Sequence, residues 1–252
     1  MRALPRRSVT ALALTGLLAL ASALPSAAAA PGVAPTRAPT DAAHCVDAST
    51  LDLGRILPPP PAAGSPQERA ELDELLRIQA TRTPAQVELA QKDAEISIFR
   101  FADALGDPRG FTAANLPLTL KLFHDARIDQ TAVSSAAKRE FARPRPFSVD
   151  SRLDPVVARP SSASYPSGHS TWAYTTALVL ADMVPERRAQ IMARADQFAH
   201  NRMIAGVHYG SDVEGGHLAG TTIAAMLFAC RPFEEEEAGA RSELRAALHL
   251  PR

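Results

Sequence analysis

The chain of 252 residues has few of the residues that commonly bind metal ions or form sulfur cross-links, with two cysteines and seven histidines. None of them falls into a zinc-binding spacing such as His-Glu-x-x-His, and the two cysteines lie far apart. The turn that carries an esterase nucleophile, Gly-x-Ser-x-Gly, is also missing. Beyond residue 30 no apolar run is long enough to cross a bilayer. These absences argue against a zinc enzyme, a serine esterase and a protein with several membrane spans.

Strand-like alternation of apolar and polar residues is nearly absent as well, and no internal repeat is visible. From Gln67 onward apolar residues recur at three- and four-residue steps, which is the spacing of a helix face. We therefore expect an all-α fold, with a single compact helical domain over residues 67–252. The pattern predicts helices from Gln67, from Pro84 through Phe101 to a stop at Gly106-Asp107-Pro108, from Pro117 to Phe123, from Asp129 to Phe141, over 170–183 and 218–230, and over 234–250, with the acidic run 234–237 as the first turn of the last helix.

Residues 1–29 have the layout of a secretory signal peptide. Basic residues open this segment, an apolar run follows over 11–24, and small residues occupy 26–30. We expect cleavage after Ala28 or Ala29 and export to the periplasm or the medium. An uncleaved membrane anchor is the alternative, although the apolar run is short for a bilayer span.

Residues 30–66 are rich in proline and include an unbroken run from Pro58 to Pro61. Proline removes backbone donors and favours the extended polyproline II conformation. We expect this segment to form an extended arm that lies across the surface of the helical domain.

Charge and cysteine count bear on the partners and the compartment of the protein. Without the three arginines of the signal, 24 basic and 27 acidic residues remain, a net charge of −3. A mildly acidic chain is a poor general binder of nucleic acid, so we expect no such partner. In an oxidising compartment an even cysteine count indicates one disulfide, here between Cys45 and Cys230. Two free buried thiols are the alternative.

Three short polar clusters stand out between residues 138 and 212. They are Lys138-x6-Arg145-Pro146, Pro166-Ser167-Gly168-His169 and Asn201-Arg202-x5-His208-x3-Asp212. Together they supply three cations, two histidines, one carboxylate and a glycine turn. Such a set predicts chemistry on a bound oxyanion, most simply phosphate.

The second cluster directly precedes an apolar, helix-forming run that starts at Ser170. A helix N-terminus presents unpaired N–H groups and the positive end of the helix dipole, and Gly168 would let a ligand approach the backbone. Ser167 would add a hydroxyl donor and His169 a proton donor. Taken alone, this cluster would favour an ordinary capped helix start with an exposed histidine.

His208 and Asp212 are four residues apart, so on a helix they would share one face. Asp212 could then accept a hydrogen bond from one ring nitrogen of His208 and direct the other nitrogen outward. Arg202 would add a planar guanidinium suited to phosphate oxygens. A surface His–Asp pair is the alternative, and solvated surface cations are the alternative for Lys138 and Arg145.

Taken together, the three clusters resemble the signature of the phosphatidic acid phosphatase type 2 superfamily: Lys-x6-Arg-Pro, Pro-Ser-Gly-His and Ser-Arg-x5-His-x3-Asp. Within it the chain is most similar to the secreted bacterial class A non-specific acid phosphatases, through the polyproline run after Leu57, Arg143-x-Arg145-Pro146-Phe147 and Ser211-Asp212-Val213. The resemblance covers about residues 55–230 and also implies an all-α fold. Asn201 departs from it, since the family has serine there, but asparagine can still donate a hydrogen bond.

The resemblance implies a role for each matched residue. His208 would be the nucleophile that forms a phosphohistidine, Asp212 would orient it, and His169 would protonate the departing alcohol and later activate water. The groups that bind the phosphate oxygens would be Lys138, Arg145, Ser167, Arg202 and the Gly168 amide. No metal ion or other cofactor is implied. Because His208 must be neutral and His169 protonated, we expect a bell-shaped pH profile on the acidic side of neutrality.

The partners implied are small phosphate monoesters as substrates and vanadate or phosphate as inhibitors, with no membrane span in the processed chain. Homo-oligomerisation stays open, since members of the family often associate. Two alternatives would use the same anion site. A vanadate-dependent haloperoxidase shares the motifs but is usually much longer, and a lipid phosphatase usually crosses the membrane several times. A non-enzymatic phosphate-binding protein would not need the two histidines together with Asp212.

Overall fold

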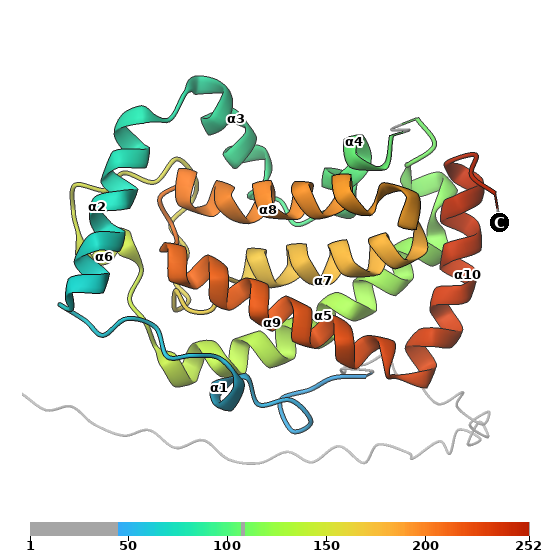
Figure 1. The fold of residues 1–252 in the computed structure, drawn as a ribbon, viewed down its shortest axis with the longest axis horizontal. Helices are drawn as coiled ribbons and strands as arrows, with labels where there is room; N and C mark the ends of the chain where they lie inside the picture. The colour runs from blue at the N-terminus through green and yellow to red at the C-terminus, as the bar shows by residue number, and fades with distance from the viewer. Residues whose placement is uncertain (1–44, 107–108, 252) are drawn as a thin grey trace, which may run out of the picture. The chain divides into compact units, whose positions relative to one another are not determined.

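The computed structural model describes residues 45–106 and 109–251, and every regular element in that part of the chain is helical. The all-α prediction is confirmed (Figure 1). The predicted signal peptide, residues 1–29, and residues 30–44 of the predicted arm lie outside the described residues. The α-helices are α1 (Leu53–Ile56), α2 (Pro66–Thr81), α3 (Pro84–Lys92), α4 (Ala102–Leu105), α5 (Pro117–Phe141), α6 (Pro146–Val149), α7 (Gly168–Met183), α8 (Arg188–Ile204), α9 (Gly210–Phe228) and α10 (Arg231–Ala247), with 3₁₀ turns at Ile98–Phe101, Ala113–Asn115 and Pro185–Arg187.

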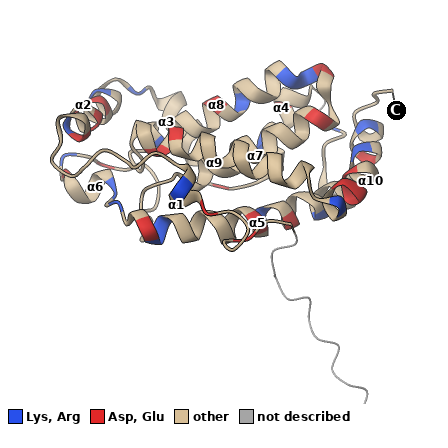
Figure 2. Cartoon of the chain, turned by 60° about the horizontal axis from the view of Figure 1, so that its bottom comes forward, with Lys and Arg blue, Asp and Glu red and all other residues tan. Residues whose placement is uncertain are grey.

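Helix α7 is the centre of the core. It is apolar almost all round, and nearly every residue from Ser170 to Met183 is buried, as expected for a helix with apolar residues on all faces. It packs most extensively against α8 and α9, with α5 also in contact (Figure 1). Charged residues lie mainly on the outer helices, such as α2 and α10 (Figure 2). The predicted helix over 170–183 is thus confirmed and begins two residues earlier.

Two glycines of α9 let this helix lie very close to α7. A Cβ atom at Gly216 would lie 2.7 Å from the carbonyl oxygen of Ser167, and one at Gly220 would lie 2.5 Å from that of Thr171. Because any side chain would collide there, glycine is required for this approach. The approach lets the Ser167 N–H donate to the Asp212 carbonyl at 2.9 Å. The N-terminal ends of α7 and α9, which carry the second cluster and the His208–Asp212 part of the third, therefore lie side by side.

The helix predicted from Pro84 to Phe101 is wrong in its second half. Helix α3 begins at Pro84, with Thr83 as its cap, but it ends at Lys92. The next residue, Asp93, is fully buried, and its carboxylate accepts hydrogen bonds from three side chains elsewhere in the chain: Arg100, Arg194 and Asn201. Those tertiary partners hold a turn that the local apolar spacing cannot reveal.

The helices predicted over 117–123 and 129–141 are one continuous helix, α5. Its inward face carries the buried polar side chains of Asp129, Gln130 and Ser134, which interrupt the apolar pattern without interrupting the helix. Helices α9 and α10 likewise begin before the predicted residues 218 and 234. Glycines disguise the first turns of α9, because glycine has a low helix propensity.

Residues 45–65 differ from the predicted extended arm in two respects. They include the helical turn α1, and Leu53 and Leu57 are buried in the core. The proline run nevertheless contacts the domain, since the Tyr165 hydroxyl donates to the Pro58 carbonyl at 2.6 Å. This segment is part of the compact helical unit instead of lying only on its surface.

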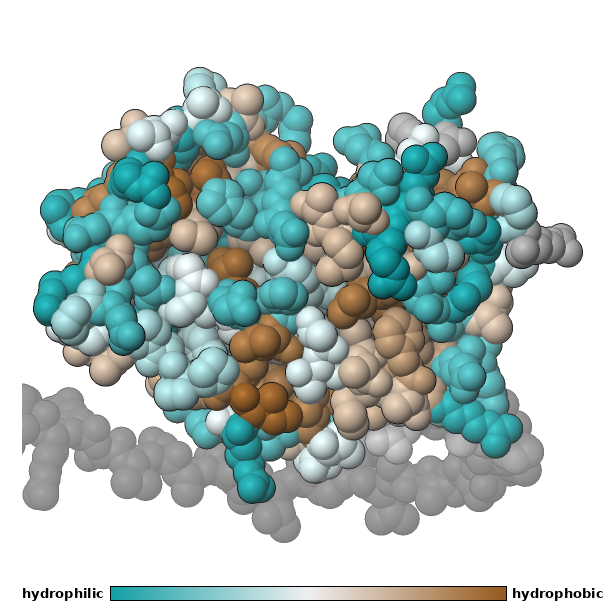
Figure 3. Space-filling view, viewed as in Figure 1, coloured by the Kyte–Doolittle hydropathy of each residue, from teal (hydrophilic) through white to brown (hydrophobic). Residues whose placement is uncertain are grey.

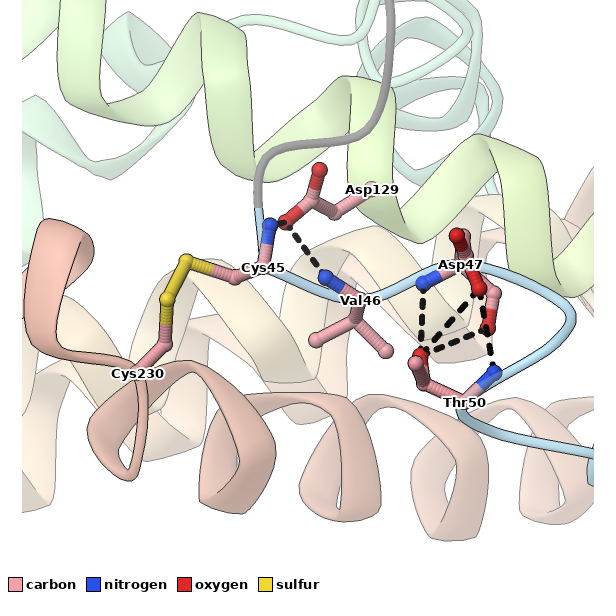
Figure 4. Close-up of a disulfide and its surroundings, with 6 residues drawn as sticks. All are labelled: Cys45, Val46, Asp47, Thr50, Asp129 and Cys230. Carbon is pink, nitrogen blue, oxygen red and sulfur yellow. Dashed lines mark hydrogen bonds between the residues drawn. A yellow bond between two sulfur atoms is a disulfide. The ribbon is translucent and has the colours of Figure 1, made fainter.

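Cys45 and Cys230 form the predicted disulfide, with their Cα atoms 5.8 Å apart across 185 residues of sequence. Beside it the Asp129 carboxylate accepts hydrogen bonds from the N–H groups of Cys45 at 2.9 Å and Val46 at 3.1 Å (Figure 4). The bridge therefore ties the start of the described chain to the junction between α9 and α10. In the chain-entropy model a loop of this length gives roughly 5 kcal/mol of stabilisation.

Some apolar side chains remain on the surface. Leu218 and Phe228 of α9 are 38% and 40% exposed, and apolar side chains gather over the middle of the face that Figure 3 shows. Among the described helices, however, none is both long and apolar enough to cross a bilayer.

Candidate active site

The three polar clusters meet around one cavity of about 250 Å³. Of the predicted site residues, those that line it are Lys138, Arg145, Gly168, His169, Arg202 and His208. Ser167 and Asp212 are fully buried just behind this lining. A larger hollow of about 560 Å³ shares Lys138 and Arg145 with the cavity, but neither histidine lines it. The smaller cavity is therefore the candidate site.

His208 and Asp212 are in contact, but they do not share a helix face as the sequence predicted. His208 lies in the turn before α9, and Asp212 lies in the first turn of that helix. The Asp212 Oδ2 atom is 3.2 Å from the His208 Nδ1 atom and accepts the Tyr209 N–H at 2.9 Å. A helix N-terminus leaves N–H groups unpaired, and an aspartate in its first turn can accept from one of them. Capping geometry, and not helical periodicity, creates the pair.

The hydrogen bonds of His208 identify its tautomer. The Arg145 Nη1 atom lies 2.9 Å from the His208 Nε2 atom. A guanidinium has no acceptor, so Nε2 must be the unprotonated nitrogen and Nδ1 carries the proton that faces Asp212. Burial, and next the positive charges of Arg145 and Lys138, hold the pKa of His208 well below its usual value. Its surroundings therefore favour the neutral imidazole, with a lone pair on Nε2.

Lys138 lines the same cavity as Arg145 and His208. The Lys138 Nζ atom donates to the carbonyl oxygens of Ala163 at 2.7 Å and Ser164 at 3.2 Å. Burial, followed by repulsion from Arg145, lowers the pKa of Lys138 to about 7. Burial also lowers the pKa of Arg145 to about 10, which leaves its guanidinium charged at neutral pH. Like charges gathered in a partly dry cavity favour the binding of an anion.

Arg202 is the clearest indication that the cavity binds an anion. Its side chain is 2% exposed, and among the described residues its Nε and Nη1 atoms are buried without a hydrogen-bond partner. Leaving a buried donor unpaired costs about 1–3 kcal/mol, and more for charged groups. An oxyanion in the cavity would satisfy these donors in the planar geometry that guanidinium groups prefer.

The N-terminus of α7 forms another wall of the cavity. Ser167 is the N-cap residue, and its Oγ atom accepts hydrogen bonds from the Ser170 N–H at 3.3 Å and the Ser170 hydroxyl at 2.9 Å. Since Oγ accepts in both, the hydroxyl proton of Ser167 remains available to donate. Gly168 is the first residue of the helix, where the N–H groups have no partner within the helix.

His169 is held from two sides. Its Nε2 atom lies 3.1 Å from the Ala94 carbonyl oxygen, and its ring stacks on Phe198 with centroids 6.1 Å apart. A carbonyl only accepts, so the proton of the neutral ring is on Nε2 and Nδ1 is unprotonated. Burial, followed by the charge of Arg202, lowers the pKa of His169 to about 3. Burial and the neighbouring cations therefore disfavour a positive charge on the His169 imidazole.

Comparison with known proteins shows the family to which the chain belongs. Residues 127–236 match the PAP2 superfamily. The acid phosphatase of Zymomonas mobilis is 30% identical over 210 residues, which cover 77% of each chain. The chain belongs to the acid phosphatases of the PAP2 superfamily. The family predicted from the three clusters is thus confirmed.

Two further comparisons agree. The non-specific acid phosphatase of Providencia stuartii is 28% identical over 217 residues, 81% of this chain and 85% of that protein. Among solved structures, a bacterial vanadium-dependent iodoperoxidase superposes with a TM-score of 0.56 at 20% identity. The match covers 69% of this chain and 52% of the iodoperoxidase. The latter likeness concerns the fold alone.

Several residues around the site of this acid phosphatase were not predicted as functional. Arg143 donates to Asp212 Oδ1 at 2.7 Å and to Glu71 of α2 at 2.8 Å, and the Ser164 hydroxyl donates to Asp212 Oδ2. Arg143 lies in a string that the resemblance had matched, so that signal was available. Glu71 and Ser164 have no local signal, because only the fold brings them near α9.

The described residues contain no group of three or more histidine, cysteine, aspartate or glutamate side chains that could hold a metal ion. The acidic groups near the cavity are instead paired with cations, as Asp212 is with Arg143 at 2.7 Å. The polar groups that line the cavity are mainly donors, which is the arrangement expected for an anion.

Proposed function

We propose that this acid phosphatase hydrolyses phosphate monoesters without a metal ion, through a phosphohistidine on His208. The observation that carries the proposal is the position of the His208 Nε2 lone pair, which lies in the same cavity as the unpaired donors of Arg202. A nucleophile beside a ready-made oxyanion site is what covalent phosphoryl transfer requires.

In the first step the His208 Nε2 atom attacks phosphorus and the bond from phosphorus to the ester oxygen breaks. Lys138, Arg145, Arg202, the Ser167 hydroxyl and the Gly168 amide bind the other three oxygens, whose charge is stabilised without reorganisation of water. His169 gives a proton to the departing alcohol oxygen. Asp212 accepts the Nδ1–H of His208 and offsets the positive charge that forms on the ring.

In the second step water attacks phosphorus, His169 takes a proton from it, and the P–N bond breaks. Phosphate leaves, and neutral His208 is restored. His169 must be protonated before the first step, although burial and the neighbouring cations lower its pKa to about 3. An anionic substrate offsets the charges of the surrounding cations and raises that pKa, so binding itself prepares the acid.

Export is part of the proposal. It is supported by the signal-like composition of residues 1–29 and by the Cys45–Cys230 disulfide, since disulfides persist in oxidising compartments. Phosphate and vanadate, which resemble the substrate and its transition state, should inhibit competitively.

The test is hydrolysis of p-nitrophenyl phosphate in the presence of EDTA, with the His208→Ala variant beside the wild type. Activity that survives EDTA and disappears in the variant is expected. Full activity in the variant would exclude His208 as the nucleophile, and loss with EDTA would exclude the metal-free mechanism. Oxidation of halide with added vanadate and peroxide, without phosphatase activity, would instead favour the haloperoxidase alternative. A preference for lipid phosphates in vesicles would favour the lipid phosphatase.

A further inference from the structure

A buried carboxylate lies close to the cavity without belonging to the groups described above. Asp93 is fully buried. Its Oδ1 atom accepts hydrogen bonds from Arg100 Nε at 2.9 Å and Arg194 Nη2 at 2.5 Å, and its Oδ2 atom accepts from Asn201 Nδ2 at 2.7 Å. A buried charge is tolerated when it is paired and hydrogen-bonded on all sides. These side chains therefore form one fixed unit.

The residue that follows Asp93 supplies a contact to His169. The carbonyl oxygen of Ala94 lies 3.1 Å from His169 Nε2. Asp93 and Ala94 lie in the turn between α3 and the 3₁₀ turn at Ile98–Phe101. No long run of helical hydrogen bonds holds the backbone there. The place of this carbonyl thus depends on what anchors the neighbouring Asp93 side chain.

One face of α8 joins the same arrangement. Arg194, Phe198 and Asn201 recur at steps of four and three residues, so they lie along one side of the helix. Phe198 stacks on the His169 ring with an interplanar angle of 21°, and the residues on either side of it bind Asp93. Helix α8 therefore contacts the ring of His169 directly and reaches its Nε2 atom through Asp93 and Ala94.

We propose that Asp93, held by Asn201, is a positioning residue for His169. The anchored Ala94 carbonyl accepts a hydrogen bond from the Nε2–H of His169, which leaves Nδ1 as the nitrogen that exchanges a proton with the substrate. The side-chain amide of Asn201 reaches the buried carboxylate and donates to it. This inference rests on the proposed function, because it takes His169 to be the general acid.

The test compares kcat/KM for phenyl phosphate and p-nitrophenyl phosphate. Phenolate is the poorer leaving group and needs a well-placed acid, whereas p-nitrophenolate departs with little protonation. In Asp93→Asn we expect kcat/KM to fall about tenfold more for phenyl phosphate than for p-nitrophenyl phosphate, because displacement of a catalytic group by about 1 Å is costly. Asn201→Ala should change the same ratio in the same direction and by less, since both arginines still hold Asp93.

Asp129→Asn is the matched control. Asp129 is another buried carboxylate, but it binds the backbone of Cys45 and Val46 near the disulfide. Its substitution should leave the ratio of the two substrates unchanged, whatever it does to the melting temperature. If Asp93→Asn does not fold, the ratio in Asn201→Ala decides.

His169→Ala separates the inference from the function on which it rests. If this variant slows both substrates equally, His169 is not the acid and the proposed mechanism fails. Suppose that His169→Ala lowers kcat/KM more for phenyl phosphate than for p-nitrophenyl phosphate, but Asp93→Asn and Asn201→Ala lower both equally. Asp93 then has no positioning role. The inference would also be overturned if phosphate inhibits the Asp93 variant more weakly while the ratio of kcat/KM for the two substrates is unchanged. The substitution would then act on phosphate binding through Arg202, the neighbour of Asn201, and not on His169.

Discussion

The Arg145 Nη1 atom lies 2.9 Å from the His208 Nε2 atom, the nitrogen that the proposed mechanism makes nucleophilic. The same Nη1 atom donates to the Val207 carbonyl at 2.9 Å, while the rest of the guanidinium binds Ser162. A phosphate in the cavity would compete with His208 for this donor. Substrate binding would then release the Nε2 lone pair at the moment when phosphorus comes into reach.

Lys138 should govern the alkaline limb of the pH profile. Its pKa is lowered to about 7, so the cation is present below that pH and is lost above it. We expect kcat/KM to fall as pH rises through this value, because one of the phosphate-binding charges disappears. Arginine stays charged to much higher pH, so Lys138→Arg should shift the limb upward. If kcat/KM of the variant falls at the same pH as that of the wild type, the alkaline limb reports another group, such as the substrate phosphate.

Asp212→Asn should reduce kcat by about 10³- to 10⁴-fold, because an amide in that place favours the wrong tautomer of His208. It should also lower the free energy of unfolding by about 3 kcal/mol, since Arg143 would lose its buried partner. His208→Ala is the comparison: it should abolish activity while leaving the Arg143–Asp212 pair intact. Steady-state kinetics and urea unfolding of both variants check this. Equal destabilisation by the two substitutions would contradict it.

Arg202→Met should separate stability from activity. Methionine is about as long as the arginine side chain up to Nε and removes the buried donors that lack a partner, so we expect the melting temperature to stay equal or rise. Activity should fall at least about 10²-fold, because one oxyanion-binding group is lost. Inorganic phosphate should raise the melting temperature of the wild type more than that of the variant. Equal stabilisation of both by phosphate would show that Arg202 does not bind it.

Gly220→Ala should destabilise the domain, since its Cβ atom would lie 2.5 Å from the Thr171 carbonyl oxygen. We expect a loss of about 1–3 kcal/mol, typical of overpacking. Gly239→Ala in the exposed part of α10 is the matched control, because the nearest atom to its Cβ would be Leu118 Cδ1 at 3.6 Å. That substitution should stabilise by up to about 1 kcal/mol through helix propensity. A stable Gly220→Ala variant would mean that α7 and α9 can separate without cost.

Much of the functional interpretation came from sequence, because the motifs are short and local. The order and spacing of the clusters that contain Lys138, Gly168 and His208 indicate an anion site from the sequence alone. The absence of strand-like alternation likewise led to the all-α fold. Both features depend on residues near one another in the chain, which is the range over which composition and spacing carry information.

Contacts between residues that are far apart in the chain could not be predicted from local sequence patterns. The end of α3 at Lys92 depends on Asp93 and its partners from α8, and the length of α5 was hidden by buried polar residues such as Asp129. Their burial is compensated by hydrogen bonds to distant groups, which a local pattern cannot contain. Apolar periodicity therefore located most helices but misplaced several of their ends.

The sequence by itself determined which chemistry the site residues offer: three cations, a glycine turn, two histidines and a carboxylate. Only the tertiary structure decided the tautomers, pKa values and hydrogen bonding of these residues. It directs the His208 lone pair toward Arg145, lowers the pKa of Lys138 to about 7 and leaves Arg202 donors unpaired. The physical reason is that tautomers, pKa values and unsatisfied hydrogen bonds depend on burial and on neighbours from several helices, and those exist only once the chain has folded.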